Sequence, residues 1–312
     1  MRILVTGGAG FIGSHVAQTY VDAGHEVLVL DNLSSGKEEN VPAGARFVFG
    51  DICSDTAAEA VRTFRPEVVN HHAAQINVRK SVEDPVFDAR VNILGTLNLL
   101  EAARKNGVRK VIFASSGGAG YGEQEYFPAD EKHPLRPVSP YGVGKVSVEG
   151  YLHFHRVQYG LEYTSLRYAN VYGPRQDPHG EAGVVAIFAT RLLRGQTAII
   201  NGDGEQTRDY VYVGDLVRAN LEALTRGDGL GINIGTGFET DVNTLFHRLR
   251  ELAGSGQDEI HGPGMPGEQR RSVIDNRLAY DELGWYPNVP LDDGLALTLA
   301  YFRDKVKSSG SR

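Results

Sequence analysis

The chain has 312 residues, of which 41% are hydrophobic and 23% charged, a composition typical of a soluble globular protein with one large domain or two closely joined ones. Its 32 Lys and Arg residues are outnumbered by 39 Asp and Glu residues, and the net charge of -7 argues against a nucleic-acid partner. The single cysteine, Cys53, excludes an internal disulfide and a thiolate-cluster metal site, and it favours a reducing compartment.

The first residues form a predicted strand, which leaves no room for a signal peptide. No apolar run reaches the roughly 18 residues that a membrane-spanning helix requires. We therefore expect a cytoplasmic protein that has no membrane partner.

Short apolar runs alternate with amphipathic segments over roughly the first 170 residues, a pattern that predicts a parallel sheet flanked by helices. The predicted strands are 2–6, 26–31, 46–50, 68–71, 110–115 and 162–167. The predicted helices are 10–23, 84–106 and 141–159, each long enough to cross over between parallel strands. We therefore expect an α/β fold with a doubly wound, Rossmann-type parallel sheet.

The pattern changes after residue 170, where a polar stretch with Gly and Pro is followed by short mixed elements. Residues 231–235 form one more predicted buried strand, so the chain is expected to return to the sheet. We expect a Rossmann domain of residues 1–172 with a return at 209–237. Residues 173–208 and 238–312 would form a smaller C-terminal substrate-binding lobe.

A glycine motif at residues 6–13 lies between the first strand and the first helix. Gly7, Gly10 and Gly13 allow a tight turn and a close approach of backbone to a pyrophosphate, which the helix N-terminus then stabilises. Asp31 ends the second predicted strand, where a carboxylate binds ribose hydroxyls. This context predicts a dinucleotide site, and the Asp31 charge favours NAD over NADP. Asp51 follows the third strand and is either an adenine contact or a helix cap.

Tyr141 and Lys145 are four residues apart at the start of a predicted helix, so both side chains lie on one face. A tyrosine base at neutral pH needs its pKa lowered by about three units, and a neighbouring ammonium favours that change. Beside a nicotinamide site, this pair predicts acid–base chemistry. The histidine pairs at 71–72 and 153 with 155 do not converge on one ion, so we expect no metal.

Motifs along nearly the whole chain resemble those of the extended short-chain dehydrogenase/reductase family. They are the 6–13 glycine motif, Asp31, Asp51-Ile52, His72-Ala73-Ala74, Asn92, Gly95-Thr96, Ser115-Ser116, Tyr121-Gly122, Tyr141 and Lys145. Later motifs resemble the nucleotide-sugar branch of that family, most closely the UDP-glucose (UDP-galactose) 4-epimerases. These are residues 167–174, Gly202-Asp203-Gly204, Arg208-Asp209-Tyr210 and Leu283-Gly284-Trp285.

The resemblance implies a role for each matching residue. Tyr141 would be the general base and acid, Lys145 its pKa partner, and Ser116 a hydrogen-bonding hydroxyl at the sugar. NAD would contact Gly7, Gly10, Phe11, Ile12, Gly13, Asp31, Asn32, Asp51, Ile52, Ala73, Ala74, Asn92, Ser115, Tyr141, Lys145 and Tyr168. The nucleotide sugar would contact Ser116, Tyr141, Asn170, Val184, Val185, Arg208, Arg271, Ser272 and Asp275. In that set Asn170, Arg208 and Arg271 would hold the diphosphate, and Asp275 the nucleoside.

Two positions depart from the pattern of the family. Gly117 stands where a Ser or Thr usually contacts the sugar, which is why Ser116 is assigned that role. Gln75 stands in a segment where related epimerases often carry a lysine.

The resemblance implies 4-epimerisation of a UDP-hexose by reversible hydride transfer to NAD through a 4-keto sugar. Segment 115–120 lacks the carboxylate that related dehydratases and decarboxylases use. Ser272 is small and predicts that UDP-N-acetylhexosamines are accepted too. The family also implies a homodimer through a four-helix interface of helices 84–106 and 141–159. A dehydratase, a decarboxylase, a non-catalytic NAD-binding regulator and a dTDP or CDP carrier stay open as alternatives.

Overall fold

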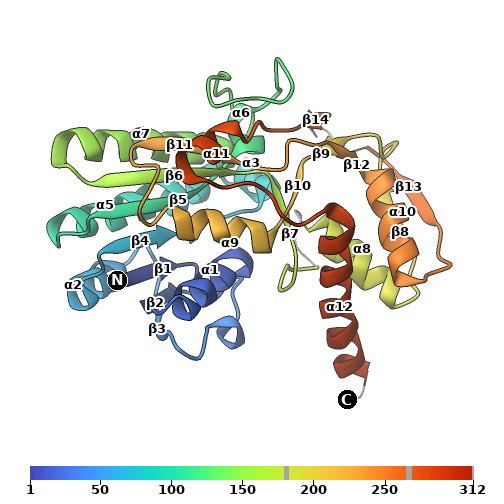
Figure 1. Ribbon diagram of the computed structural model, residues 1–312, viewed down its shortest axis with the longest axis horizontal. Coiled ribbons are helices and arrows are strands. Elements are labelled where there is room, and N and C mark those ends of the chain that lie inside the picture. The colour runs from blue at the N-terminus through green and yellow to red at the C-terminus, as the bar shows by residue number, and fades with distance from the viewer. Residues whose placement is uncertain (179–182, 265–268, 311–312) are drawn as a thin grey trace.

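The computed structural model describes residues 1–178, 183–264 and 269–310. A seven-stranded parallel sheet lies at its centre, in the order β11-β6-β5-β4-β1-β2-β3 (Figure 1). The strands are β1 (Arg2–Thr6), β2 (Glu26–Asp31), β3 (Arg46–Phe49), β4 (Val68–His71), β5 (Lys110–Ser116), β6 (Glu162–Tyr168) and β11 (Leu230–Ile234). This order confirms the predicted Rossmann-type fold, and each strand begins and ends within a residue of its expected bounds.

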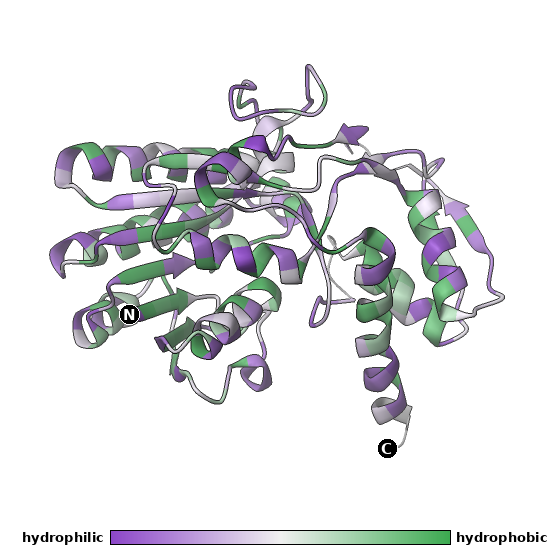
Figure 2. Ribbon diagram, in the orientation of Figure 1, coloured by the Kyte–Doolittle hydropathy of each residue, from purple (hydrophilic) through white to green (hydrophobic). Residues whose placement is uncertain are grey.

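Helices cover both faces of the sheet because the strands are apolar on both sides. Figure 2 shows β1 and β4 mostly in the hydrophobic colour. One face packs against α1 (Phe11–Asp22), α9 (Val213–Glu222) and α11 (Arg277–Leu283). The other packs against α2 (Asp55–Phe64), α5 (Thr96–Lys105) and α7 (Pro140–Tyr159). The short elements η1 (Glu38–Asn40), α3 (Val78–Glu83) and α6 (Gly117–Tyr121) lie in the connections.

The helix expected at 84–106 is interrupted. It comprises α4 (Pro85–Ala89), a π-helical stretch η2 (Arg90–Gly95) and α5. Asn92, a predicted cofactor residue, is buried within the π-helical stretch. Such stretches often mark functional sites, and helical periodicity alone does not reveal them.

The C-terminal part of the chain has a core of its own. Helices α8 (Val184–Leu193), α10 (Val242–Ala253) and α12 (Leu291–Gly310) pack with β8 (Ala198–Asn201), which pairs with β13 (Glu259–Gly262). Figure 1 places these elements beside the sheet. Short strands connect the two parts: β7 (Asn170–Tyr172), β9 (Thr207–Arg208), β10 (Tyr210–Tyr212), β12 (Thr240–Asp241) and β14 (Arg271–Ser272).

Residues 277–285 pack against the sheet, although the expected division assigns them to the C-terminal lobe. Ala279, Leu283 and Trp285 belong to the core that contains β1 and α1. Trp285 also donates a hydrogen bond from its indole nitrogen to the carbonyl of Asp215 at 2.8 Å. The division at 172, 209 and 237 stays a prediction.

Candidate active site

The glycine turn between β1 and α1 leaves its backbone open at the carboxyl end of the sheet. Gly7 has a φ of 69°, and a Cβ there would lie 2.6 Å from the backbone nitrogen of Ala73. A Cβ on Gly13 would collide with the carbonyl oxygen of Gly7. Because β1 and β4 are neighbours where the strand order reverses, this turn lies at the crevice where such sheets bind ligands. These residues fit a dinucleotide pyrophosphate.

Asp31 ends β2 beside this turn and is buried. Its carboxylate accepts hydrogen bonds from the backbone nitrogens of Ala9 at 2.9 Å and Leu33 at 2.8 Å. Asn32 donates to the Asp51 carboxylate at 2.8 Å, so two predicted cofactor residues from different strands are in contact. Burial opposes ionisation of Asp51, but hydrogen bonds from Cys53 and Asn32 hold its pKa below the ordinary value. Asp31 and Asp51, the two acidic residues expected at the nucleoside end, are therefore connected through Asn32, which follows Asp31 in the chain and binds Asp51.

The remaining predicted cofactor residues line the neighbouring strand ends. Ala73 follows β4, and its backbone nitrogen donates to the Thr6 hydroxyl at 3.3 Å. Tyr168 lies at the end of β6, where its ring stacks on His72 and its hydroxyl contacts Asn220. Ile52 is buried against Gly95, where a Cβ would approach it to 2.9 Å. Phe11 and Ile12 begin α1, and Ala74 follows Ala73.

Tyr141 and Lys145 lie together on α7, as their spacing predicts. The Lys145 ammonium is 5.6 Å from the centre of the Tyr141 ring and 4.8 Å from that of Phe113. It donates a hydrogen bond to the carbonyl of Ala114 at 2.7 Å. Ser139 caps the helix by accepting from the nitrogen of Gly142 at 3.2 Å. This pair occupies the carboxyl end of β5.

Burial shifts the two pKa values in opposite directions. It raises the pKa of Tyr141 to about 12, with a further contribution from the Asp88 charge. It lowers the pKa of Lys145 to about 8, while Asp88 and Glu149 act to raise it. Burial and the Asp88 charge therefore oppose the lowered pKa that a tyrosine base needs. The role of Lys145 as the pKa partner of Tyr141 stays a prediction.

Asp88 is a residue that sequence reasoning missed. Its side chain is buried, and its carboxylate accepts hydrogen bonds from Asn92 at 3.0 Å and Gln75 at 2.9 Å. Gln75 also binds Asn92, because its backbone nitrogen donates to the side-chain oxygen of Asn92 at 2.9 Å. The spacing of Asp88 and Asn92 by one helical turn was the available signal. The backbone of residue 75 thus holds Asn92, and the Gln75 side chain, which departs from the family pattern, holds Asp88.

The sugar end of the site is formed by β5, α6 and the segment at β14. The Ser116 hydroxyl caps α6 and accepts from the nitrogen of Ala119 at 3.2 Å. A Cβ on Gly117 would lie 3.1 Å from the Ile274 side chain, so a larger residue there would press against Ile274. A Cβ on Gly118 would lie 3.3 Å from the Ser272 hydroxyl. Ser116 and Ser272 are therefore brought to the same short helix.

The two predicted diphosphate arginines lie on neighbouring strands, because β14 pairs with β9. Arg271 stacks on Phe127 at 3.8 Å, and its guanidinium binds the Glu239 carboxylate at 2.6 and 3.0 Å. Arg208 donates to the carbonyl of Thr207 at 2.8 Å. The guanidinium of Arg271 is thus engaged by an acid that the sequence did not indicate.

The other predicted substrate residues differ in which of their polar groups already have hydrogen-bond partners and in how deeply their side chains are buried. Asn170 begins β7, and its backbone nitrogen donates to the Asp209 carbonyl at 2.9 Å. The Asp275 carboxylate accepts from the Arg277 side chain at 2.8 Å. Val184 begins α8, whereas the Val185 side chain is 1% exposed in the lobe core, so only its backbone is left for a ligand.

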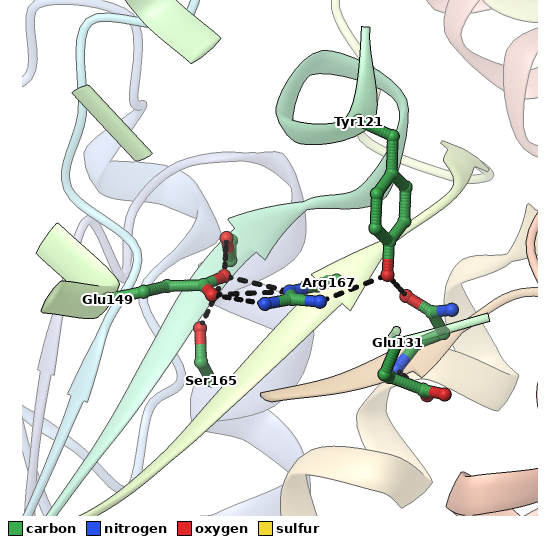
Figure 3. A network of polar contacts seen from close by, with 7 residues as sticks. Tyr121, Glu131, Glu149, Ser165 and Arg167 are labelled. Carbon is green, nitrogen blue, oxygen red and sulfur yellow. Dashed lines mark hydrogen bonds and ion pairs between the residues drawn. The ribbon is translucent and has the colours of Figure 1, made fainter. Parts of the chain in front are cut away.

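A buried polar network joins α7 to the sheet and was not expected from the sequence (Figure 3). The Glu149 carboxylate binds the Arg167 guanidinium at 2.6 Å and accepts from the hydroxyls of Ser115 at 2.6 Å and Ser165 at 3.0 Å. Ser115 was expected at the cofactor, but its hydroxyl is directed at Glu149.

Within the described ranges, no group of three or more His, Cys, Asp or Glu side chains is arranged to hold a metal ion. In the same part of the chain, no helix combines the length and apolarity needed to cross a membrane.

Residues 3–235 match the model of the NAD-dependent epimerase/dehydratase family. The chain belongs to this family. A UDP-glucose 4-epimerase of Mycolicibacterium smegmatis is 48% identical, with 98% of this chain and 99% of the relative covered. The family's cofactor is NAD, and the glycine turn with Asp31 fits it.

Two solved structures are similar over nearly the full length of the chain. The UDP-glucose 4-epimerase of Thermotoga maritima, solved with UDP-glucose, has a TM-score of 0.97 and 52% identity over 98% of this chain and 100% of its own. The UDP-glucose 4-epimerase of Thermus thermophilus, solved with NAD, has a TM-score of 0.93 and 48% identity over 97% of this chain and 99% of its own.

Proposed function

We propose that the protein is an NAD-dependent UDP-glucose/UDP-galactose 4-epimerase. The observation that carries this proposal is the placement of Tyr141 and Lys145 on one turn of α7, at the strand ends that also carry the glycine turn. The names of the similar proteins support UDP-glucose as the nucleotide sugar and NAD as the cofactor. A tyrosine, a lysine and a nicotinamide suffice for reversible oxidation of an alcohol.

In the proposed reaction, Tyr141, Lys145 and Ser116 have different roles. NAD, when bound, supplies a hydride acceptor and, in its oxidised form, a positive charge. Tyr141 takes the proton of the sugar 4-hydroxyl and later returns a proton to the 4-oxygen, after the sugar has turned its other face to the site. Lys145 is protonated below pH values of about 8 and holds positive charge 5.6 Å from the centre of the Tyr141 ring. Ser116 donates a hydrogen bond to the sugar.

Binding through the nucleotide diphosphate would let the hexose turn over between the two proton transfers. Arg208 and Arg271 lie on paired strands of a small three-stranded sheet that is separate from the central sheet. If Arg271 exchanges Glu239 for the diphosphate, the tight contacts are at the nucleotide and the sugar stays loosely held. This arrangement predicts poor activity on free galactose.

Epimerisation fits better than dehydration or decarboxylation. Residues 115–121 carry no carboxylate, and Glu149, which touches Ser115, is already bound to Arg167 and Ser165. The test is incubation of purified protein with UDP-galactose without added reductant, followed by chromatography. UDP-glucose is the expected product, whereas a 4-keto-6-deoxy sugar or carbon dioxide would contradict the proposal.

We also propose that UDP-N-acetylhexosamines are accepted. Ser272 is small and lies next to α6, where a Gly118 Cβ would approach its hydroxyl to 3.3 Å. A bulkier side chain at this position would fill space beside the sugar. UDP-N-acetylgalactosamine should therefore be converted, and no conversion by protein that is active on UDP-galactose would contradict this extension.

A homodimer formed through α7 and the helices at 85–105 is a further proposal. Exposed apolar side chains lie on both: Val86 and Leu94 on one, and Val143, Phe154 and Val157 on the other. A Cβ on Gly150 would meet nothing within 4 Å, so this face of α7 can approach another helix closely. A cytoplasmic location, which the free Cys53 suits, stays a prediction.

A further inference from the structure

Glu149 occupies the turn of α7 that follows Lys145, and it is almost as buried. Its side chain is 12% exposed and that of its partner Arg167 is 10% exposed. Both oxygens of the carboxylate face the Arg167 guanidinium, at 2.6 to 3.2 Å. One of them also accepts from Ser115 and Ser165. A carboxylate that accepts this many hydrogen bonds is fixed in place.

Two side chains of α7 hold consecutive residues at the end of β5. Lys145 donates to the carbonyl of Ala114 at 2.7 Å, and Glu149 accepts from the hydroxyl of Ser115 at 2.6 Å. The next residue is Ser116, which caps α6 and is a proposed sugar contact. The position of Ser116 relative to the Tyr141 helix therefore depends on both bonds.

The network continues from Arg167 to the far side of the site. Arg167 donates to the Tyr121 hydroxyl at 3.0 Å, which donates to Asn233 of β11 at 2.7 Å (Figure 3). The backbone nitrogen of Asn233 donates to Glu131 at 2.8 Å. Helix α6, strand β11 and the loop before α7 are thus joined to Glu149.

The Lys145 ammonium lies among a small set of charged and titratable groups. Asp88 of α4 and Glu149 of α7 raise its pKa against the effect of burial. His71 of β4 and His72, which follows it, have pKa values lowered to about 3, by burial and by the Lys145 charge, and are neutral. Tyr141 on α7 is neutral as well. Glu149 is therefore one of two negative charges that keep this lysine cationic.

We propose that Glu149 is a positioning residue of the active site, which fixes α7 to the end of β5 and keeps the Lys145 ammonium charged beside Tyr141. It touches neither sugar nor cofactor and acts through Lys145, Ser115 and Arg167. The kinetic part of this inference rests on the proposed epimerase function. The part that concerns the charge of Lys145 does not depend on that function, and this charge is measured separately.

The experiment compares three variants of the full chain with the wild type. Glu149→Gln removes the carboxylate charge. Glu149→Gln/Arg167→Gln removes both charges, so that no guanidinium is left buried and unpaired. Asp228→Asn is the matched control, because it takes the carboxylate from another buried cation, Lys110, 2.5 Å away at the opposite end of β5.

Two quantities are measured for each protein, together with thermal unfolding. The first is the pKa of Lys145, by NMR titration of 13Cε-labelled lysine with the signal assigned from Lys145→Arg. The second is the pH dependence of kcat and KM on UDP-galactose. In Glu149→Gln the Lys145 pKa and the alkaline limb of kcat should move to lower pH by about half to one unit, with KM nearly unchanged. In the double variant both should move in the same direction by a smaller amount, because the positive charge of Arg167 is lost as well. Asp228→Asn should move neither.

An unchanged Lys145 pKa in both Glu149 variants would overturn the proposal and reduce Glu149 to a structural residue. A lowered pKa with an unmoved alkaline limb would overturn the kinetic part. If the wild type does not epimerise UDP-galactose, the proposed function fails, and the NMR titration still decides whether Glu149 sets the charge of Lys145.

Discussion

Tyr141 and Lys145 share a buried position in which the protein alone does not favour a phenolate. Burial raises the pKa of Tyr141 to about 12 and lowers that of Lys145 to about 8. A deprotonated tyrosine therefore needs more positive charge than one lysine provides, and oxidised NAD would add it. The spacing of the pair was readable from the sequence, but the degree of burial and the Asp88 charge depend on packing between helices distant in sequence.

Replacement of Tyr141 by Phe should abolish most of the activity without loss of the fold. The ring is retained, while the proton acceptor is removed, so kcat should fall by about a hundredfold or more. The measurement is steady-state turnover of UDP-galactose, with NAD content and the unfolding temperature as controls. A kcat within threefold of the wild type would exclude Tyr141 as the base.

Replacement of Gly13 by Ala should reduce cofactor binding. The added Cβ collides with the carbonyl oxygen of Gly7 and must move the turn that fits the pyrophosphate. NAD released by denaturing the purified protein should drop severalfold relative to the wild type. Gly256→Ala is the control, because its Cβ meets nothing within 4 Å. Equal NAD content in both variants would argue against this turn as the pyrophosphate site.

Helix α7 carries three functions on two faces. Tyr141, Lys145 and Glu149 follow one another at four-residue intervals on the face toward the site and the sheet, and Val143, Phe154 and Val157 are exposed. The sequence predicted the helix and its catalytic pair. Arg167 is 18 residues beyond Glu149 and on another element, so the network between them depends on the pairing of β5 with β6. Sequence spacing gives no access to such a contact.

The exposed face of helices 85–105 offers a test of the proposed dimer. Leu94 is 60% exposed there, and a charge at that position would be buried on association. Leu94→Glu should therefore convert the protein to a monomer in light scattering. Leu297→Glu on α12, where the leucine is 51% exposed, should leave the mass unchanged. A wild-type monomer, or a Leu94→Glu dimer, would contradict the proposed interface.

At the scale of the whole molecule, the junction between sheet and lobe contains a buried acid. Asp209 lies between β9 and β10 and accepts hydrogen bonds from the nitrogens of Thr236 and Gly237 and from the Thr236 hydroxyl. Burial nevertheless raises its pKa to about 6. The glycine turn and Asp31, which belong to one βαβ unit, were predictable. The return of the chain to the sheet at β11 was predictable too, but the meeting of Asp209 with Thr236 was not, because it depends on how the segment before β10 packs against the end of β11.

This junction predicts a pH dependence of stability. Because the folded pKa of Asp209 lies above the unfolded value, the folded state binds the proton more tightly, and the contribution of this group falls as the pH rises from about 4 to 6. Asp209→Asn cannot ionise, so its stability relative to the wild type should increase over that range. Urea unfolding of both proteins at pH 4.5 and about pH 7 measures this difference. A difference independent of pH would contradict it.

In the proposed epimerisation, hydrogen is removed from carbon 4 of the sugar and returned to it within one site. The most direct test is conversion of UDP-galactose that carries deuterium at carbon 4, analysed by NMR of the product. We predict UDP-glucose that keeps the deuterium at carbon 4, and no such product from Tyr141→Phe. Exchange of the label for solvent hydrogen would show that the hydrogen leaves as a proton, and it would contradict the account.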